Sequence, residues 1–399
     1  MRISLPPFRP DMPVSVTGCA SYDKEEVRRA LATLLAPLGG LSFVRPGTRV
    51  VIKANLVAGM KPEKAATTHP VLLEVLAEEI VRLGGRVVIG DSPGGLYSAA
   101  ALSHIYAAAG LRPLEREGIS LNRDFGERTA AFPAGKVLKS LTYTSYLDEC
   151  DYIINFAKLK SHGMMGMSCA AKNMFGTVPG LLKPEYHYRF PAHADFADML
   201  LDLDDFFRPV LSIADAVVAM EGNGPTAGEP RFVGCLLASA SPHCLDLAAA
   251  DILGRGKEIP TLEAAWRRGM IPANAEGLTL YGRPADFSVP DFKNIETPSS
   301  LSFVGQEDRA IARLGKALLG KILSTRPQLH RELCVGCGVC RNICPAHAIV
   351  IAQGKAHIDR DKCIRCFCCQ EFCPKSAMKV KKSLLMRFFH RKEKRQRRK

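Results

Sequence analysis

The chain has 399 residues, of which 47% are hydrophobic, so it is long enough to form two or three domains with a substantial core. Its formal net charge is +14, but residues 379–399 contain eleven Lys or Arg and one acidic residue, which leaves about +4 for the other 378 residues. The charge therefore does not identify the whole chain as a nucleic-acid-binding protein, because the basic excess lies in the tail.

The sequence shows no sign of export or of a membrane span. The N-terminus has no apolar signal segment, and no stretch reaches the uncharged length that a bilayer-spanning helix needs. Cysteines at positions 19, 150, 169, 235 and 244 show no pairing pattern, which favours reduced thiols. We therefore expect a cytoplasmic protein.

The first regular elements form a strand–helix–strand unit. Residues 48–57 (TRVVIKANLV) are typical of a buried strand, and so is the segment GGRVVIGD, which ends at Asp91. Between them the spacing predicts a helix that Thr67 or Thr68 caps and that has Pro70 in its first turn. A Gly-Gly pair ends this helix, and its apolar stripe consists of Val71, Leu72, Val75, Leu76, Ile80 and Val81.

Three more strands are predicted, over residues 152–156, 211–214 and 232–238. The last of these precedes a helix that Ser241 caps and that has Pro242 in its first turn. Strands that alternate with helices are typical of an α/β domain with a largely parallel sheet.

Polar residues gather just after the predicted strands. In open α/β sheets the carboxyl ends of parallel strands meet at one edge, where ligands bind. We therefore expect these residues to converge on one lysine-rich crevice. They are Lys53 and Asn55 after the first strand, Asp91 after the second, Lys158, Lys160 and His162 after the third, and Asp215, Glu221 and Asn223 after the fourth.

The densest polar group spans residues 158–163 (KLKSHG) and 172–176 (KNMFG), and it suits an anionic substrate. Lysines bind carboxylate or phosphate as point charges, and a histidine shuttles protons near neutral pH. We predict His162, Lys160 and Asp91 as catalytic residues, with His162 as the proton donor. The alternative is that these lysines are ordinary solvated residues beside glycine turns. The predicted substrate-binding residues are Lys53, Asn55, Lys158, Lys172, Asn173 and His187.

Six short segments carry a resemblance to a known family: Ile52-Lys53-Ala54-Asn55, Thr68-His69-Pro70, Gly90-Asp91-Ser92-Pro93, Lys158-Leu159-Lys160-Ser161-His162-Gly163, Lys172-Asn173-Met174-Phe175-Gly176 and Met220-Glu221-Gly222-Asn223-Gly224-Pro225. Through them, residues 14–254 resemble the domain of unknown function 362 family, whose members often carry an appended ferredoxin domain. Where the family usually has Thr-Asp-Pro, this chain has Thr68-His69-Pro70, so any role of that aspartate is not carried over to His69. Where the family usually has Lys-Pro-Asn, this chain has Lys53-Ala54-Asn55. The resemblance implies a large domain of this family, but the family supplies no general reaction.

Weaker signals complete the N-terminal part. The glycines at positions 222 and 224 lack the spacing of a dinucleotide-binding loop, and we interpret this segment as a turn. Cys244 is expected in the core, and Asp246 is placed so that it can face the crevice. After about Ile259 the helical pattern gives way to a stretch that Pro and Gly interrupt. Gln306–Leu323 is then predicted as a connecting helix.

Eight cysteines near the C-terminus form two copies of the pattern C-x2-C-x2-C-x3-C-P, and the second copy lies 29 residues after the first. This spacing is typical of a protein with two cubane iron–sulfur clusters, because one tight loop supplies three thiolates to each cluster. In the bacterial arrangement the cysteine before the proline binds the other cluster. We therefore predict two [4Fe–4S] clusters, one on Cys334, Cys337, Cys340 and Cys373 and the other on Cys363, Cys366, Cys369 and Cys344.

Zinc ribbons, disulfides and inert buried thiols are the alternatives. Zinc sites pair C-x2-C knuckles across a longer gap, and disulfides need an oxidising compartment. Gly336 and Gly338 suit close backbone approach to the first cluster, whereas Arg365 and Phe367 stand at the equivalent positions of the second loop. The two clusters should therefore differ in potential. A ninth thiol, Cys368, is expected to be a small buried residue, and the alternative is a redox-active or substitute ligand.

The segment from about Glu332 to Val380 resembles a bacterial-type ferredoxin domain, with both cysteine motifs intact. The resemblance is specific, but it covers only this short part of the chain. It implies a small α+β fold of two hairpins and two short helices that passes one electron at a time at low potential. A redox partner protein is therefore expected.

We expect four parts: an α/β domain over residues 1–300, a helical connector over 301–330, a two-cluster domain over 331–380 and a basic tail over 381–399. The preferred interpretation is an iron–sulfur oxidoreductase that passes low-potential electrons to an anionic small molecule in the crevice. The alternative is a non-catalytic electron carrier whose large domain docks a partner or senses a ligand.

The basic tail leaves several partners open. Its apolar residues suit an amphipathic segment on an anionic membrane surface, and its bases equally suit RNA or an acidic redox partner. A solvated tail without a partner is the simplest alternative. The expected location is the cytoplasm, with the membrane periphery as the second candidate. The apolar residues are Leu384, Leu385, Met386, Phe388 and Phe389.

Overall fold

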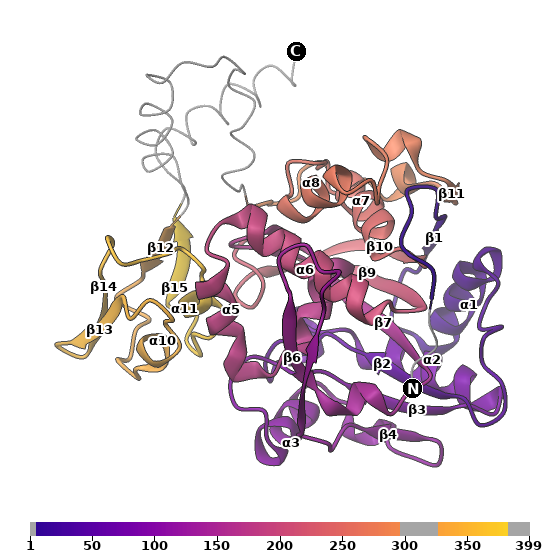
Figure 1. The fold of residues 1–399 in the computed structure, drawn as a ribbon, viewed down its shortest axis with the longest axis horizontal. Helices are drawn as coiled ribbons and strands as arrows, with labels where there is room; N and C mark the ends of the chain where they lie inside the picture. Colours follow the sequence, from indigo (N-terminus) through magenta and orange to yellow (C-terminus); the bar gives the residue numbers. More distant parts are fainter. Residues whose placement is uncertain (1–4, 296–325, 382–399) are drawn as a thin grey trace.

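The computed structural model of the protein describes residues 5–295 and 326–381 (Figure 1). Its large domain is organised around a nine-stranded sheet with the order β11-β1-β10-β9-β7-β2-β3-β4, and β8 pairs with β7 beside this path. The strands are β1 Val14–Gly18, β2 Arg49–Lys53, β3 Arg86–Gly90, β4 Ile119–Leu121, β7 Tyr152–His162, β8 Gly166–Ser168, β9 Leu211–Glu221, β10 Glu229–Ser239 and β11 Leu280–Tyr281.

Most neighbouring strands of this sheet are parallel, as predicted. β4, β3, β2, β7 and β9 run parallel to one another, whereas β10 is antiparallel to both β9 and β1. Parallel neighbours need a crossover, and helix α2 (Pro70–Arg82) supplies it between β2 and β3. The connection between β9 and β10 is a short turn around Gly222, which makes an antiparallel pair possible. The fold class expected from the sequence is thus confirmed.

Helices cover both faces of the sheet (Figure 1). Each face has its own hydrophobic core. Successive residues of β7 point to opposite faces, so that Ile153 belongs to one core and Ile154 to the other. One face is covered by α1 (Lys24–Leu35), α2 and α3 (Ala99–Ala108), and the other by α6 (His193–Phe207), α7 (Pro242–Ile252) and α8 (Pro260–Arg267).

Helix caps are only partly as predicted. Ser241 caps α7, because its Oγ accepts a hydrogen bond from the Cys244 amide at 3.2 Å, and Cys244 is buried as expected. For α2 the prediction is wrong: His69 is the N-cap residue, and it makes no side-chain cap. The Thr68 hydroxyl instead donates to the Phe156 carbonyl at 2.8 Å and accepts from the Asn55 amide at 3.0 Å. It therefore ties the segment after β2 to β7.

Two strands are longer than predicted. β7 continues to His162, so Lys158, Lys160 and His162 lie within a strand and not in the loop after it. The extension is stable because β8 pairs with it on one side, with Lys160 opposite Ser168, while β9 runs along the other side. β9 likewise continues to Glu221, which places Asp215 inside the strand. In both cases polar residues that suggested a loop are buried within the sheet.

The stretch after Ile259 also differs from the prediction, because it contains a helix. Pro260 occupies the first turn of α8. Backbone amides of the first turn have no acceptor within the helix, so the missing amide hydrogen of proline costs no hydrogen bond there. Leu262 and Ala265 of α8 are buried in the core that α6 also covers. The predicted helix over 306–323 and the tail after residue 381 lie outside the described residues, as do most of the predicted connector bounds.

The small C-terminal domain has α+β structure, as predicted. Two pairs of antiparallel strands, β12 with β15 and β13 with β14, flank two short helices. Each helix lies within one cysteine motif and ends before its last cysteine. The elements are β12 Arg326–Leu329, α10 Val339–Asn342, β13 Ile349–Ala352, β14 Lys355–Ile358, α11 Cys368–Glu371 and β15 Met378–Lys381.

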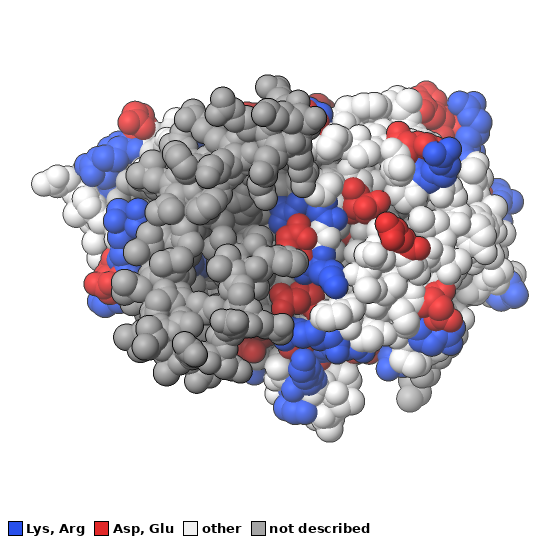
Figure 2. Space-filling view, turned by 90° about the horizontal axis from the view of Figure 1, so that it is seen from above, with Lys and Arg blue, Asp and Glu red and all other residues white. Residues whose placement is uncertain are grey.

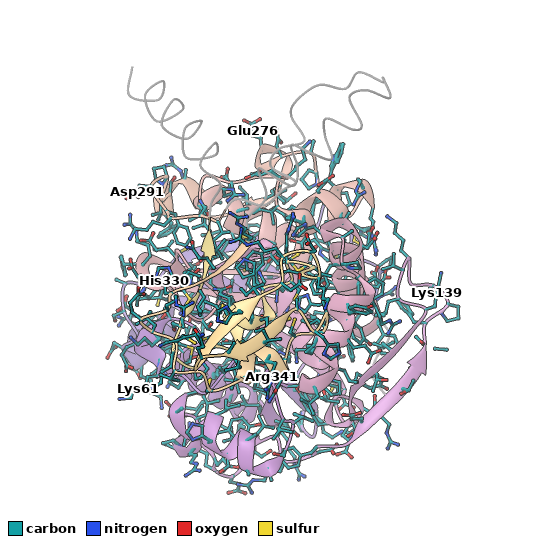
Figure 3. All side chains as sticks on the ribbon, turned by 90° about the vertical axis from the view of Figure 1, so that its left-hand side faces the viewer. Lys61, Lys139, Glu276, Asp291, His330 and Arg341 are labelled. Atoms are coloured by element: carbon teal, nitrogen blue, oxygen red, sulfur yellow. The ribbon has the colours of Figure 1, made fainter. Side chains whose placement is uncertain are left out.

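The small domain lies against the large domain, as Figure 3 shows from the side on which His330 and Arg341 are labelled. The Gln370 amide donates to the carbonyls of Asn223 and Gly224 at 2.8 and 2.9 Å. The Phe367 ring is buried in the core beneath α6. The Phe372 ring lies so close to Gly94 that any side chain at position 94 would collide with it. The contact thus combines specific hydrogen bonds with apolar burial.

Charged residues of both signs lie next to each other on the described surface seen from above, and uncharged residues cover most of the remainder (Figure 2). This mixture agrees with the small net charge of the chain outside the tail. Within residues 5–295 and 326–381, no helix is long and apolar enough to cross a membrane.

One buried carboxylate holds several elements of the large domain together. Asp202 of α6 accepts hydrogen bonds from three consecutive backbone amides, those of residues 136–138, at 2.8–3.0 Å. It also forms an ion pair of 2.8 Å with Arg268, directly after α8. These amides lie between β5 (Glu127–Ala131) and β6 (Ser140–Thr144), so Asp202 fixes the hairpin to the helices.

We predict that Asp202→Ala destabilises the protein by on the order of 3–5 kcal/mol, because it leaves three backbone amides without their buried acceptor and removes one of the carboxylates that pair with Arg268. Chemical denaturation followed by circular dichroism measures the change. Asp195→Ala on the same helix is the control, since Asp195 is exposed in the first turn and contributes only about 0.5 kcal/mol there. Equal stability of the two variants would contradict this role of Asp202.

Candidate functional site

The eight predicted cluster ligands surround two separate pockets of the small domain. One pocket is lined by Cys334, Cys337, Cys340 and Cys373, and the other by Cys344, Cys363, Cys366 and Cys369. Each pocket therefore gathers the first three thiols of one motif and the last thiol of the other motif, and Cys368 is a fifth thiol in the wall of the second pocket. Within residues 5–295 and 326–381, no three His, Cys, Asp or Glu side chains converge closely enough for a single metal ion. The assignment of the pockets to clusters therefore depends on which thiols line each one.

The backbone of both cysteine loops fits a bound cluster. Gly336 and Gly338 have φ of +67° and +79°, and Arg365 and Phe367 adopt the same left-handed conformation with φ of +61° and +62°. The two loops therefore have one shape despite their different residues. Backbone amides already donate to thiols, as in the hydrogen bond of 3.2 Å from Ala377 to Cys373, and such donors stabilise a cluster.

The two loops differ in their surroundings. Cys337 of the first loop is exposed, and its neighbour Val335 is 60% exposed. In the second loop, Cys366, Cys369 and Phe367 are buried, and Phe367 packs into the core of the large domain. Cys368 is also buried, as expected for a small side chain in this position. The first pocket therefore faces outward, and the second faces the large domain.

Two of the predicted substrate-binding lysines form buried ion pairs. Lys53 lies 2.6 Å from Asp91, and Lys158 lies 2.7 Å from Asp215, with all four side chains at most 4% exposed. Burial lowers the pKa of both lysines, and the neighbouring carboxylate opposes that shift. Both ammonium groups thus have a carboxylate partner within the protein. They contribute to the electrostatic field of the site, but they are not free to bind an anion.

Lys160 is buried without a carboxylate partner. It donates to the Asn55 side-chain oxygen at 2.7 Å and to the Ala66 carbonyl at 2.6 Å. Burial lowers its pKa from 10.5 to about 7. Asn55 is itself held by Asn173, to whose side-chain oxygen it donates at 2.8 Å. The structure thus joins three predicted site residues in one hydrogen-bonded network.

His162 has a defined tautomer. Its Nδ1 accepts hydrogen bonds from the amides of Met164 and Met165 at 3.1 and 3.2 Å, so the hydrogen of the neutral ring is on Nε2. This Nε2 is buried and has no partner among the described residues. Burial lowers the pKa of His162 well below its ordinary value. The ring is therefore a neutral hydrogen-bond donor near pH 7, which differs from the protonated acid expected from the sequence.

Lys172 and His187 lie beside His162 and are also unsatisfied. The Lys172 ammonium has no hydrogen-bond or ion-pair partner among the described residues and lies 5.5 Å from the centre of the Phe175 ring. His187 stacks on Phe196 at 4.3 Å, and its buried Nδ1 has no partner there either. Burial and the charge of Lys172 lower the pKa of His187 to about 3. These residues form a cluster of buried polar groups that other described residues do not satisfy.

This cluster faces the second cysteine loop. Burial lowers the pKa of Lys172, whereas Glu371 and Cys368 of that loop act in the opposite direction. The Gln370 side-chain oxygen is buried and has no hydrogen-bond partner in the described part of the chain, and a Cβ atom at Gly163 would lie 2.9 Å from it. We define the interdomain site as His162, Lys172, His187 and Gln370. It is located between the β7 extension and the second pocket.

Sequence reasoning missed two groups near this site. Lys183 at the start of α5 (Lys183–Arg189) is buried, donates to the Val178 carbonyl at 2.7 Å, and has a pKa that burial lowers to about 7. His193 at the start of α6 has a pKa that burial lowers to about 4. Neither follows a predicted strand, so the strand-end criterion did not find them. Asp246 does not face the crevice: it accepts the amides of Ala170 and Ala171 and orients α4 (Ala170–Asn173).

A family model described as "Domain of unknown function (DUF362)" matches residues 50–251, which is half of the chain. The chain belongs to this family. A second model, described as "4Fe-4S dicluster domain", matches residues 326–374. Together with the two thiol-lined pockets, this match establishes an iron–sulfur protein of the DUF362 family.

Two proteins illustrate the similarity. "Thylakoid-associated protein sll1697" of Synechocystis sp. is 35% identical over 294 residues, which cover 73% of this chain and 90% of that protein. The structure of the lactate racemase apoprotein from Thermoanaerobacterium thermosaccharolyticum is 14% identical, with a TM-score of 0.38 over 63% of this chain and 59% of that chain.

The lowered pKa of Lys160 yields a prediction about stability. The folded state releases the Lys160 proton near pH 7, whereas the unfolded chain holds it up to pH 10.5. Because the unfolded state binds more protons in this range, stability should rise with pH from 7 towards 10. Lys160→Met removes this contribution.

The melting temperature of the wild type, relative to that of Lys160→Met, should therefore increase between pH 7 and 9. Differential scanning fluorimetry measures it. Lys61→Met, at an exposed position labelled in Figure 3, should follow the wild type. A constant difference between the wild type and Lys160→Met at all pH values would show that Lys160 keeps an ordinary pKa.

Proposed function

We propose that the protein is an oxidoreductase with two [4Fe–4S] clusters that passes electrons to an anionic small molecule bound at the interdomain site. The observation that supports it best is the position of the second cysteine loop, whose residues Phe367 and Gln370 pack onto the large domain beside Lys172 and His162. A thiol-lined pocket and a cluster of unsatisfied hydrogen-bond donors thus adjoin one another.

The thiols of each pocket are the groups that would hold a cluster. Cys334, Cys337, Cys340 and Cys373 surround the outward-facing pocket, and the crossed set surrounds the pocket that faces the large domain. When bound, such clusters supply one electron at a time. The remaining task of the protein is to bind, orient and protonate the acceptor.

The chemistry of the interdomain site favours an anion. An unsatisfied buried donor costs about 1–3 kcal/mol, so the folded protein gains stability when a ligand accepts from it. Lys172 and the Nε2–H of His162 are both donors, and they require acceptor oxygens. A carboxylate or phosphate group offers several such oxygens and also neutralises the Lys172 charge. The proposed substrate therefore carries one of these groups.

The proposed roles divide the predicted residues into three groups. Lys172, His162 and His187 bind and orient the anion, and Lys160 supplies a proton, because its pKa of about 7 suits acid catalysis near neutral pH. Asn55 and Asn173 hold Lys160 in place. The paired residues, which maintain the field of the site without contacting the substrate, are Lys53, Asp91, Lys158 and Asp215.

A second candidate function is that of an electron carrier without catalysis of its own. It is supported by the name of the 35% identical relative, a thylakoid-associated protein, together with eleven Lys or Arg in residues 379–399. In this proposal the tail binds an anionic membrane surface from the cytoplasmic side, and a partner protein exchanges electrons at the outward-facing pocket.

Binding of the tail to nucleic acid would instead make nucleic acid co-purify in a salt-dependent manner.

Crossed ligation leads to a test with double variants. C337S/C373S removes two thiols from one pocket, so we expect this variant to retain one cluster, about four iron atoms per chain. C337S/C344S is the matched control, because it removes one thiol from each pocket and should weaken both clusters. Iron analysis and electron paramagnetic resonance of anaerobically purified protein measure the result. The reverse order of iron contents would establish uncrossed ligation.

The anion hypothesis predicts a retained ligand. Native mass spectrometry of anaerobically purified protein should show the chain with two cubanes and one small anion. The Lys172→Ala variant should keep the cubanes and lose the anion, because the Lys172 ammonium is the group that donates hydrogen bonds to the anion in this proposal. Lys61→Ala should retain both. A wild type that carries cubanes but never an anion, even after incubation with cell extract metabolites, would favour the carrier function.

A further inference from the structure

A second concave site lies on the small domain, on the side of the second cysteine loop. It is a pocket of about 300 Å³ between β12, β14 and that loop. Its basic lining residues come from all three segments, and the predicted cluster ligand Cys363 is also part of its wall. They are Arg326, Arg331, His357, Arg360 and Arg365.

Among the described residues, the basic side chains that line this pocket outnumber the acidic ones. No Asp or Glu is among its lining residues. Arg326, Arg331 and Arg360 have no ion pair with any described carboxylate, whereas Arg268 of the large domain contacts three. Residues 326–381 contain ten Lys or Arg against four Asp or Glu. Several guanidinium groups therefore share one small volume and repel one another.

The shape and chemistry of the pocket together indicate its ligand. A guanidinium group is planar and donates two parallel hydrogen bonds to phosphate or carboxylate oxygens, and it remains charged at any physiological pH. Several of them around one hollow match a multiply charged oxyanion better than a single carboxylate. The volume is also in the range of small-molecule sites, whereas a protein partner would need a broad and flatter surface.

We propose that this pocket binds the phosphate or pyrophosphate group of a ligand directly beside Cys363. This site differs from the interdomain site in its residues and in its location, and the proposal does not depend on the proposed reaction. The phosphate belongs either to a free small molecule or to a lipid headgroup, and the chemistry of recognition is the same in both cases.

The position of Cys363 in the wall gives the binding a redox consequence. Positive charge near a cluster favours the addition of an electron, and a bound oxyanion cancels that charge. The midpoint potential of the cluster on Cys363 should therefore become more negative when the pocket is filled. The cluster in the other pocket, which Cys337 and Cys340 line, should change less, because that pocket does not include these arginines.

Isothermal titration of the anaerobic, cluster-loaded full chain with inorganic pyrophosphate tests the proposal. We expect one pyrophosphate per chain, and at least tenfold weaker binding to the R331Q/R360Q variant. Both residues are exposed, so the fold should persist, which iron content and circular dichroism check. The control R341Q/R283Q removes the same charge from exposed arginines outside the pocket and should bind as the wild type does. Equal affinity of the two variants, or no binding at all, would overturn the proposal.

Vesicles distinguish the two sources of phosphate. If the ligand is a headgroup, phosphatidylglycerol vesicles should bind the wild type but not the R331Q/R360Q variant, and added pyrophosphate should release the wild type. If the ligand is a free small molecule, the wild type and R331Q/R360Q should bind vesicles equally, whereas their affinities for pyrophosphate should still differ. A redox titration followed by electron paramagnetic resonance supplies an independent readout: pyrophosphate should lower one midpoint potential in the wild type and in R341Q/R283Q, but not in R331Q/R360Q.

Discussion

Burial of positive charge at the centre of the parallel sheet is the constraint on which the large domain depends. Lys53 on β2 and Lys158 on β7 are fully buried, and such charges are tolerated only with a close partner. Asp91 and Asp215 supply it, and each also binds backbone: Asp91 accepts the Leu56 amide and Asp215 the His69 amide. The ion pairs therefore fix the segments that follow the strands. Loss of one partner would leave a buried charge at a cost of about 3–5 kcal/mol.

The small domain completes this arrangement. Lys160 and Lys172 form no ion pair with a described carboxylate, and the opposite charge that acts on each most strongly is Glu371 of the second cysteine loop. Gln370 and Phe367 hold that loop in place through hydrogen bonds and apolar burial. The two domains thus share one electrostatic environment. A change of charge at the second pocket is therefore felt by the buried lysines of the large domain.

The sequence was sufficient where the signal is local. The cysteine spacing anticipated both pockets and their crossed lining, and Ser241 with Pro242 marked the start of α7. It was insufficient where the cause is long-range. The continuation of β7 through Lys158 depends on pairing with β8 and β9, and its charge is balanced by Asp215, 57 residues away. The pattern of hydrophobic and polar residues along the chain predicts that such lysines are solvated, because this pattern contains no information about a carboxylate that is distant in sequence.

Gly176 illustrates how closely this charge balance is tied to sterics. A Cβ atom at this position would overlap both the Lys53 ammonium and the Asp91 carboxylate, since the backbone of residue 176 passes directly over the pair. Its carbonyl also accepts the Ser92 amide at 3.1 Å, which keeps the backbone from moving away. Replacement of glycine by alanine adds one methyl group and no charge. At position 176 that neutral change would nevertheless act as an electrostatic mutation, because the methyl group would separate two buried ions.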